Sequence, residues 1–228
     1  MATNTGTLDR KHYRTLSFDC YGTLIDWESG ILGYLQPLLE SVDAHVIDEW
    51  VLAFYAEVEP AVQAEGGSYR SVLSRVLERF GKRLGFTPGE DDLAGFAASI
   101  EYWQPFADTV DALKRLSGDF DLIALSNIDD DLFAMSARAM GNPFKWLISA
   151  QQVGAYKPDP RMFQALLDTA QGPVLHVAQS RFHDIVPATA AGLDTVWINR
   201  PSLGATLKAD AAPTWTFSSL AEFADAWV

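Results

Sequence analysis

The sequence is poor in cysteine, in positive charge and in long apolar runs. Cys20 is the one cysteine among 228 residues, so no disulfide can form within the chain. Lysine and arginine together number 17 against 30 aspartates and glutamates, giving a formal net charge of −13. Such a charge repels nucleic acid, anionic lipid and, at long range, an anionic substrate. An acidic substrate would therefore need positive charge inside its pocket.

No apolar run reaches the length of a membrane span, and the first 14 residues are polar, without the apolar region of a secretory signal. We therefore expect a cytoplasmic protein with neither a membrane nor a nucleic acid as partner. The histidines His12, His45 and His176 do not cluster in the sequence, so no zinc-binding spacing is present.

Apolar residues make up 48% of the chain, enough for a sizeable core. Short apolar segments predict buried strands, and helical patterns fall between them. Such alternation is typical of an α/β fold with a doubly wound parallel sheet. The predicted strands are residues 13–20, 122–126, 146–149, 174–178, 195–198 and, at an edge, 214–217; the predicted helices include residues 109–116, 132–140, 161–167 and 221–227.

The stretch of residues 27–104 contains no convincing strand. It has helical patterns, with turns indicated by Gly66-Gly67 and Pro88-Gly89. We therefore predict a core domain of residues 1–26 and 105–228, with a helical cap domain of residues 27–104 inserted after the first strand.

Polar side chains gather at the predicted carboxyl ends of the strands, where ligands bind in doubly wound sheets. Asp19 ends the first strand, and its carboxylate could attack an electrophile to form an ester or an acyl phosphate. Thr23 can hydrogen-bond that carboxylate, and Gly22 permits a tight turn whose N–H groups could bind an anion.

Three further groups belong to the same predicted rim. Ser126-Asn127 ends the second strand and offers a hydroxyl and an amide. Lys157 lies in a Tyr-Lys-Pro-Asp-Pro loop, and Asp184, after the fourth strand, could orient it or help to activate a water.

As a set, these motifs resemble the haloacid dehalogenase superfamily over residues 13–26 and 104–200. The matching elements are Asp19-Cys20-Tyr21-Gly22-Thr23, Ser126-Asn127, Lys157-Pro158-Asp159 and Asp184. Phosphatases of the superfamily carry a second aspartate two residues after the nucleophile, where this chain has Tyr21. Gln179 stands where they have a metal-binding acid. Two carboxylates beside a lysine make a poor Mg²⁺ site, so we expect neither metal nor cofactor and place the phosphatase reading last.

The resemblance is closest to the 2-haloacid dehalogenases, and it implies a role for each residue. Asp19 would attack the halogen-bearing carbon and expel halide, and water would then hydrolyse the ester. Lys157 would stabilise the anionic Asp19 and then the oxyanion. Asp184 would hold Lys157. Thr23 would take part in catalysis by positioning Asp19. The substrate would be bound by Tyr21, Ser126, Asn127, Arg181 and Trp50.

The sequence departs from this family in the cap. The dehalogenases have an arginine early in the cap that receives halide, but no Arg or Lys occurs in residues 15–69, and Val51 follows Trp50. Arg70, Arg181, or a cradle of aromatic and histidine side chains that includes His45 or Trp50 could substitute, or the leaving group could be something other than halide.

The resulting prediction is metal-independent hydrolysis of a short 2-haloalkanoic acid, a small halocarboxylate, to the 2-hydroxy acid. One alternative is a related hydrolase acting on a different small carboxylate. Another is a non-catalytic protein that binds small acids. Related enzymes are often homodimers, so a homodimer is left open.

Overall fold

A six-stranded, wholly parallel sheet forms the centre of the computed structural model, which describes residues 8–202, 207 and 209–227. The first half of the polar N-terminal segment thus lies outside the described residues. The strand order β3-β2-β1-β4-β5-β6 confirms the doubly wound sheet, with the last strand at an edge. The strands are β1 (Thr15–Phe18), β2 (Asp121–Ser126), β3 (Trp146–Ser149), β4 (Val174–Ala178), β5 (Asp194–Ile198) and β6 (Trp215–Phe217).

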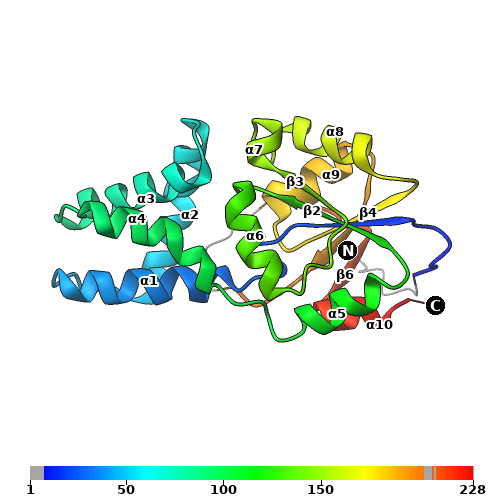
Figure 1. Cartoon of the computed structure of the whole chain (residues 1–228), viewed down its shortest axis with the longest axis horizontal. Helices are drawn as coiled ribbons and strands as arrows, with labels where there is room; N and C mark the ends of the chain where they lie inside the picture. Colours follow the sequence, from blue (N-terminus) through cyan, green and yellow to red (C-terminus); the bar gives the residue numbers. More distant parts are fainter. Residues whose placement is uncertain (1–7, 203–206, 208, 228) are drawn as a thin grey trace.

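Helices cover both faces of the sheet (Figure 1). Along β2, Ile123 and Leu125 pack with Phe163 of α8, whereas Leu122 and Ala124 belong to the larger core that includes Phe223 of α10. This alternation follows from the two-residue period of a strand buried on both faces. The core helices are α5 (Thr109–Leu116), α6 (Asp130–Ala139), α7 (Ala150–Val153), α8 (Pro160–Thr169), α9 (Val186–Ala190) and α10 (Leu220–Asp225).

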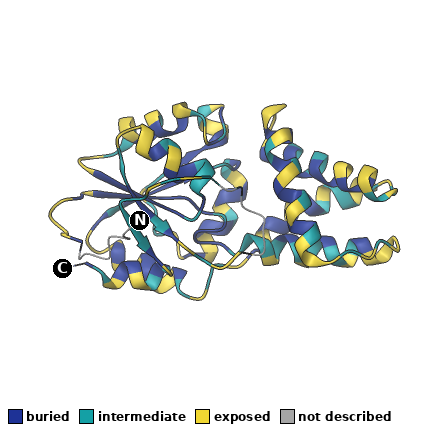
Figure 2. Cartoon of the chain, turned by 180° about the vertical axis from the view of Figure 1, so that it is seen from behind, coloured by how far each residue is buried: buried dark blue, intermediate teal, exposed yellow. Residues whose placement is uncertain are grey.

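A group of helices between β1 and α5 projects to one side of the sheet, and their apolar faces pack on one another (Figures 1 and 2). They are α1 (Trp27–Ser41), α2 (Asp48–Ala64), α3 (Tyr69–Leu84), α4 (Glu90–Ala98) and the 3-10 helix η1 (Ser99–Tyr102). We call this group the cap; its status as a separate domain stays a prediction. None of the described helices combines the length and the apolar character needed to cross a membrane.

Two contacts tie the α2–α3 turn of the cap to the core. The carboxylate of Asp129, just before α6, accepts the backbone N–H groups of Tyr69 and Arg70 at 2.9 and 3.0 Å, and so caps the start of α3. The Tyr156 hydroxyl donates to the Gly67 carbonyl at 2.9 Å. These contacts hold the cap above the carboxyl ends of the strands.

Candidate active site

Asp19 directly follows β1, and both of its carboxylate oxygens are hydrogen-bonded. Oδ1 accepts from Lys157 Nζ at 2.8 Å, and Oδ2 accepts from Thr23 Oγ1 at 2.5 Å. The turn behind it requires glycine, since Gly22 has φ +91° and an added Cβ would lie 3.0 Å from Trp27 Nε1. The Gly22 N–H donates to the Ile25 carbonyl at 2.9 Å, so of the N–H groups in this turn it is not one that is available to an anion.

Lys157 is 2% exposed and lies between two acids. Its ammonium group donates to Asp19, to Asp184 Oδ1 at 2.7 Å and to the Leu125 carbonyl at 2.9 Å, which uses all three of its protons. Burial disfavours the charged lysine, but the two carboxylates prevail and raise its pKa.

The two acids around Lys157 differ in their surroundings. Burial, with repulsion from Asp184, raises the pKa of Asp19 against the opposing effect of Lys157. Burial also disfavours the ionised Asp184, but Lys157 and His176 outweigh it and lower the pKa of that carboxyl. Asp184 is therefore the more firmly ionised of the two. In the described ranges 8–202 and 209–227, no group of three or more His, Cys, Asp or Glu side chains could hold a metal ion.

Two residues position this ion-pair cluster from behind. The Asn127 amide makes two hydrogen bonds to the main chain of Lys157. Its Oδ1 accepts from the Lys157 N–H at 2.6 Å, and its Nδ2 donates to the Lys157 carbonyl at 3.0 Å. His176 is fully buried; its Nε2 lies 3.1 Å from Asp184 Oδ1 and its Nδ1 2.8 Å from Ser17 Oγ. Sequence reasoning missed His176, although its place on β4 opposite Ser17 is the signal that would have found it.

A cavity of about 60 Å³ lies in front of Asp19. Of the predicted site residues, it brings together Asp19, Tyr21, Ser126, Asn127, Lys157 and Asp184, while Thr23 contacts Asp19 directly. Three cap side chains that sequence reasoning did not single out, Glu59, Gln63 and Tyr69, also line it. The remaining lining residues are Trp27, Gln179, Ser180 and His183.

Ser126, like Asp184, is a lining residue with unused bonding capacity. Its Oγ is buried and has no hydrogen-bond partner among the described residues. The backbone N–H groups of Cys20 and Tyr21, beside Asp19, likewise make no hydrogen bond within the described part of the chain. Buried polar groups normally find partners, so these three donors are available to a ligand.

Two expected substrate-binding residues lie elsewhere, which corrects their assignment. Trp50 stacks on Phe54 inside the cap with ring centroids 5.2 Å apart. Because 3.6 residues make a helical turn, it lies about half a turn from Glu59 around α2, on the far side from the cavity. Arg181 begins the π-helical turn η2 (Arg181–Ile185), and its guanidinium lies 3.8 Å from the centre of the Trp197 ring instead of lining the cavity.

The other suggested replacements for the cap arginine also point away from the cavity. Arg70 pairs with Asp131 at 2.6 Å on the surface, and His45 is exposed and pairs with Asp43 at 2.9 Å. Lys157 is therefore the one cationic side chain in the described cavity lining.

The cap supplies a buried acid in place of an arginine. Glu59 is 7% exposed, and its Oε1 accepts from the Gln63 amide and, at 3.3 Å, from the Tyr69 hydroxyl. Burial raises the pKa of Glu59 to about 7, partly opposed by Tyr69. Spacing of four residues puts Glu59 and Gln63 on one face of α2, and a polar pair within that buried face is the sequence signal that was overlooked.

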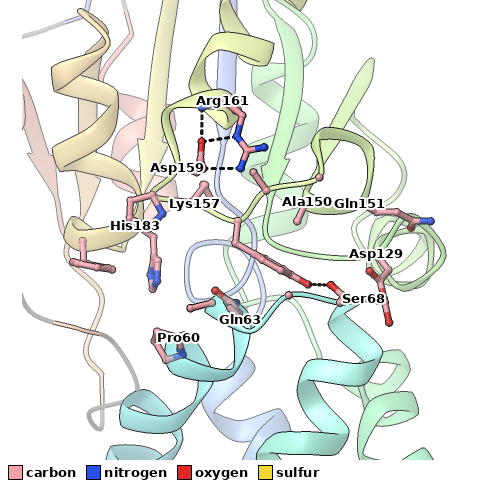
Figure 3. A pocket seen from close by; sticks show the side chains of 18 residues that line it. Pro60, Gln63, Ser68, Asp129, Ala150, Gln151, Lys157, Asp159, Arg161 and His183 are labelled. Atoms are coloured by element: carbon pink, nitrogen blue, oxygen red, sulfur yellow. Dashed lines mark hydrogen bonds and ion pairs between the residues drawn. The ribbon is translucent and has the colours of Figure 1, made fainter.

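A larger space of about 720 Å³ opens beside the cavity, between the α2–α3 turn and the Lys157 loop. Figure 3 shows Pro60, Gln63 and Ser68 of the cap facing Lys157 and His183 of the core across it. Gln63, Lys157 and His183 line both spaces. We call the larger space the vestibule, because it adjoins the cavity at these three residues.

Comparison with known proteins agrees with this geometry. The haloacid dehalogenase-like hydrolase family matches residues 13–180. This chain belongs to that family. It is similar to an (S)-2-haloacid dehalogenase of Pseudomonas putida, 26% identical over 94% of this chain and 96% of the relative. It is also similar to the pyrimidine 5'-nucleotidase YjjG of Escherichia coli (strain K12), 30% identical over 64% of this chain and 67% of the relative.

A solved structure of an L-2-haloacid dehalogenase superimposes with a TM-score of 0.78, at 26% identity, covering 93% of this chain and 97% of that chain. The chain is therefore a haloacid dehalogenase-like hydrolase by sequence and by fold. Its relatives include both dehalogenases and a nucleotidase, so the reaction has to be argued from the site.

Proposed function

We propose that this protein hydrolyses the bond between C2 and a substituent, halide in the first instance, of a short carboxylic acid through an ester on Asp19. The observation that carries the proposal is the arrangement of Asp19, Lys157 and Asp184 at the end of a cavity of about 60 Å³. In that arrangement the Lys157 ammonium group lies between the carboxylates of Asp19 and Asp184 and uses all three of its protons in hydrogen bonds.

The size of the cavity favours a small substrate. A space of about 60 Å³ takes roughly four or five water-sized groups, which matches a two- or three-carbon acid. A nucleotide is several times larger and would need the vestibule as well. Ser126 Oγ and the N–H groups of Cys20 and Tyr21 would bind the substrate carboxylate, leaving C2 beside Asp19.

The reaction then follows from the contacts. Asp19 attacks C2, the new C–O bond forms as the C2–substituent bond breaks, and the departing atom takes the electron pair. Water next attacks the carbonyl carbon of the ester, and Lys157 stabilises the oxyanion. Asp184 Oδ2, which has no partner among the described residues, would accept a proton from that water. The 2-hydroxy acid leaves and Asp19 is regenerated.

The experiment measures halide released from bromoacetate, chloroacetate and both enantiomers of 2-chloropropionate, with EDTA present. We expect turnover by the parent and a loss of at least a thousandfold in Asp19→Asn. Absence of halide release from all four substrates would refute the proposal. A parallel assay of p-nitrophenyl phosphate with Mg²⁺ tests the phosphatase alternative, and turnover there alone would replace the proposal with phosphoryl transfer.

A further inference from the structure

The cap residue Glu59 has no part in the reaction so far, although it faces the reacting atoms. It lines the same small cavity as Asp19, and both residues are 7% exposed. Asp19 and Lys157 belong to the core, whereas Glu59 reaches the cavity from α2 of the cap. A substrate bound between core and cap would therefore lie beside Glu59 while Asp19 attacks it.

The hydrogen bonds of Glu59 leave one oxygen free to carry a proton. Gln63 and Tyr69 both donate to Oε1, which therefore serves as the acceptor. Oε2 makes no hydrogen bond within the described part of the chain. A carboxylic acid bonded in this way presents its O–H from Oε2.

The charges around the cavity also favour a neutral Glu59. Asp19 and Asp184 together outnumber the single positive charge of Lys157, and a bound substrate carboxylate would add another negative charge. An ionised Glu59 would be one more anion in a space with little water. The titratable or charged groups around it are Tyr55 and Tyr69 of the cap and Asp19, Tyr21, Tyr156, Lys157, His183 and Asp184 of the core.

We propose that Glu59, in its protonated form, is the acid that donates a proton to the departing atom, and that the enzyme is suited to leaving groups that depart as bases. This inference rests on the proposed function above. Bromide and chloride leave as stable anions and gain little from a proton. Fluoride and the oxygen of a strained ring are more basic and gain much more.

The step balances in atoms and electrons. The Asp19 oxygen forms a bond to carbon as the bond from carbon to fluorine or ring oxygen breaks. The departing atom takes that electron pair and receives the proton from Glu59 Oε2, giving hydrogen fluoride or an alcohol. Glu59 is left as a carboxylate and regains its proton from solvent after the ester is hydrolysed. No oxidant, reductant or further co-reactant is required.

The test compares the parent with Glu59→Gln, which keeps the shape and the acceptor oxygen but has no carboxylic proton. Glu57→Gln is the matched control, because Glu57 is an exposed glutamate on the same helix. Turnover of fluoroacetate and glycidate, an epoxide carboxylate, is measured against that of bromoacetate. We expect kcat of Glu59→Gln to fall about a hundredfold more on fluoroacetate and glycidate than on bromoacetate. The parent should also lose fluoride release as the pH rises above about 7, with Glu59 protonated only below that range.

An equal loss on all three substrates, or no loss on any, would overturn the role of Glu59. So would turnover of bromoacetate by the parent without turnover of fluoroacetate or glycidate, a result that leaves the proposed function intact. If the parent turns over none of the three, the proposed function fails and the role of Glu59 fails with it. Circular dichroism of both variants separates loss of chemistry from loss of fold.

Discussion

Glu59 should make the stability of this protein depend on pH in a way that a single substitution removes. Burial raises the pKa of Glu59 from its ordinary 4.5 to about 7 in the folded chain. A group whose pKa is raised on folding contributes stability that is fully present below its unfolded pKa and is lost as the pH rises through its folded pKa. The free energy of unfolding should therefore fall as the pH rises toward about 7 and stay at the lower value above it.

The size of the penalty follows from the two pKa values. Each unit between the folded and the unfolded pKa corresponds to about 1.4 kcal/mol. The free energy of unfolding of the parent, relative to that of Glu59→Gln, should therefore fall by about 2 to 3 kcal/mol between pH 5 and pH 8. Groups elsewhere that titrate alike in both proteins cancel from this difference.

Urea denaturation at a series of pH values measures the effect, with Glu57→Gln as the control that should follow the parent at every pH. A difference between the parent and Glu59→Gln that stays constant from pH 5 to pH 8 would refute the reasoning, since it would mean that Glu59 titrates alike in the folded and unfolded chains. The assay uses no substrate, so its result is independent of the reaction proposed.

Further predictions concern the ion-pair cluster and the contact between cap and core. Lys157→Met leaves two buried carboxylates facing each other and should abolish halide release and cost about 3 to 5 kcal/mol in urea unfolding; activity within tenfold of the parent would contradict it. Asp129→Ala removes the acceptor of the Tyr69 and Arg70 N–H groups, while Ser68 still caps α3, and should lower the free energy of unfolding by about 1 kcal/mol. An unchanged value would mean that these two hydrogen bonds do not stabilise the fold. Burial lowers the pKa of His183 to about 4, so its ring should stay neutral from pH 8 to pH 5 by NMR, and a midpoint above pH 6 would count against the structure of this cavity.

Much of the fold could be predicted because strands buried on both faces leave a clear pattern. Two strands were predicted with their observed bounds, Val174–Ala178 and Trp146–Ser149. A short apolar run between turns is typical of a buried strand. The first predicted strand, residues 13–20, extended two residues beyond each end of β1. The residues after Phe18 enter the turn that carries the nucleophile, and local turn geometry overrides the apolar pattern.

Part of the site followed from topology alone. Asp19, Lys157 and Asp184 are far apart in the sequence, yet the rule that carboxyl ends of strands meet at one edge brings them together. Lys157 Nζ donates to Asp19 at 2.8 Å and to Asp184 at 2.7 Å. That rule applies only to the sheet. It does not tell which face of a cap helix turns toward the core.

The cap is therefore where sequence reasoning did least well. Trp50 was chosen because it resembles a position of the family, but the rotation of α2 turns Trp50 into the cap and Glu59 toward the cavity. Arg181 was chosen for its charge, but stacking on Trp197 holds its guanidinium outside the cavity. Both placements depend on packing between elements, and the sequence pattern of one element carries little information about that.

The central claim is that an ester forms on Asp19, and isotope incorporation tests it most directly. The protein, in excess over bromoacetate, completes a single turnover in water enriched in oxygen-18. The mass of the peptide that contains Asp19 is then measured by mass spectrometry. We expect one labelled oxygen in Asp19 and none in the glycolate product, because water attacks the carbonyl carbon of the ester and the product takes its oxygen from Asp19. Label in the product with none in Asp19 would mean that water attacks the substrate directly, and would contradict the account.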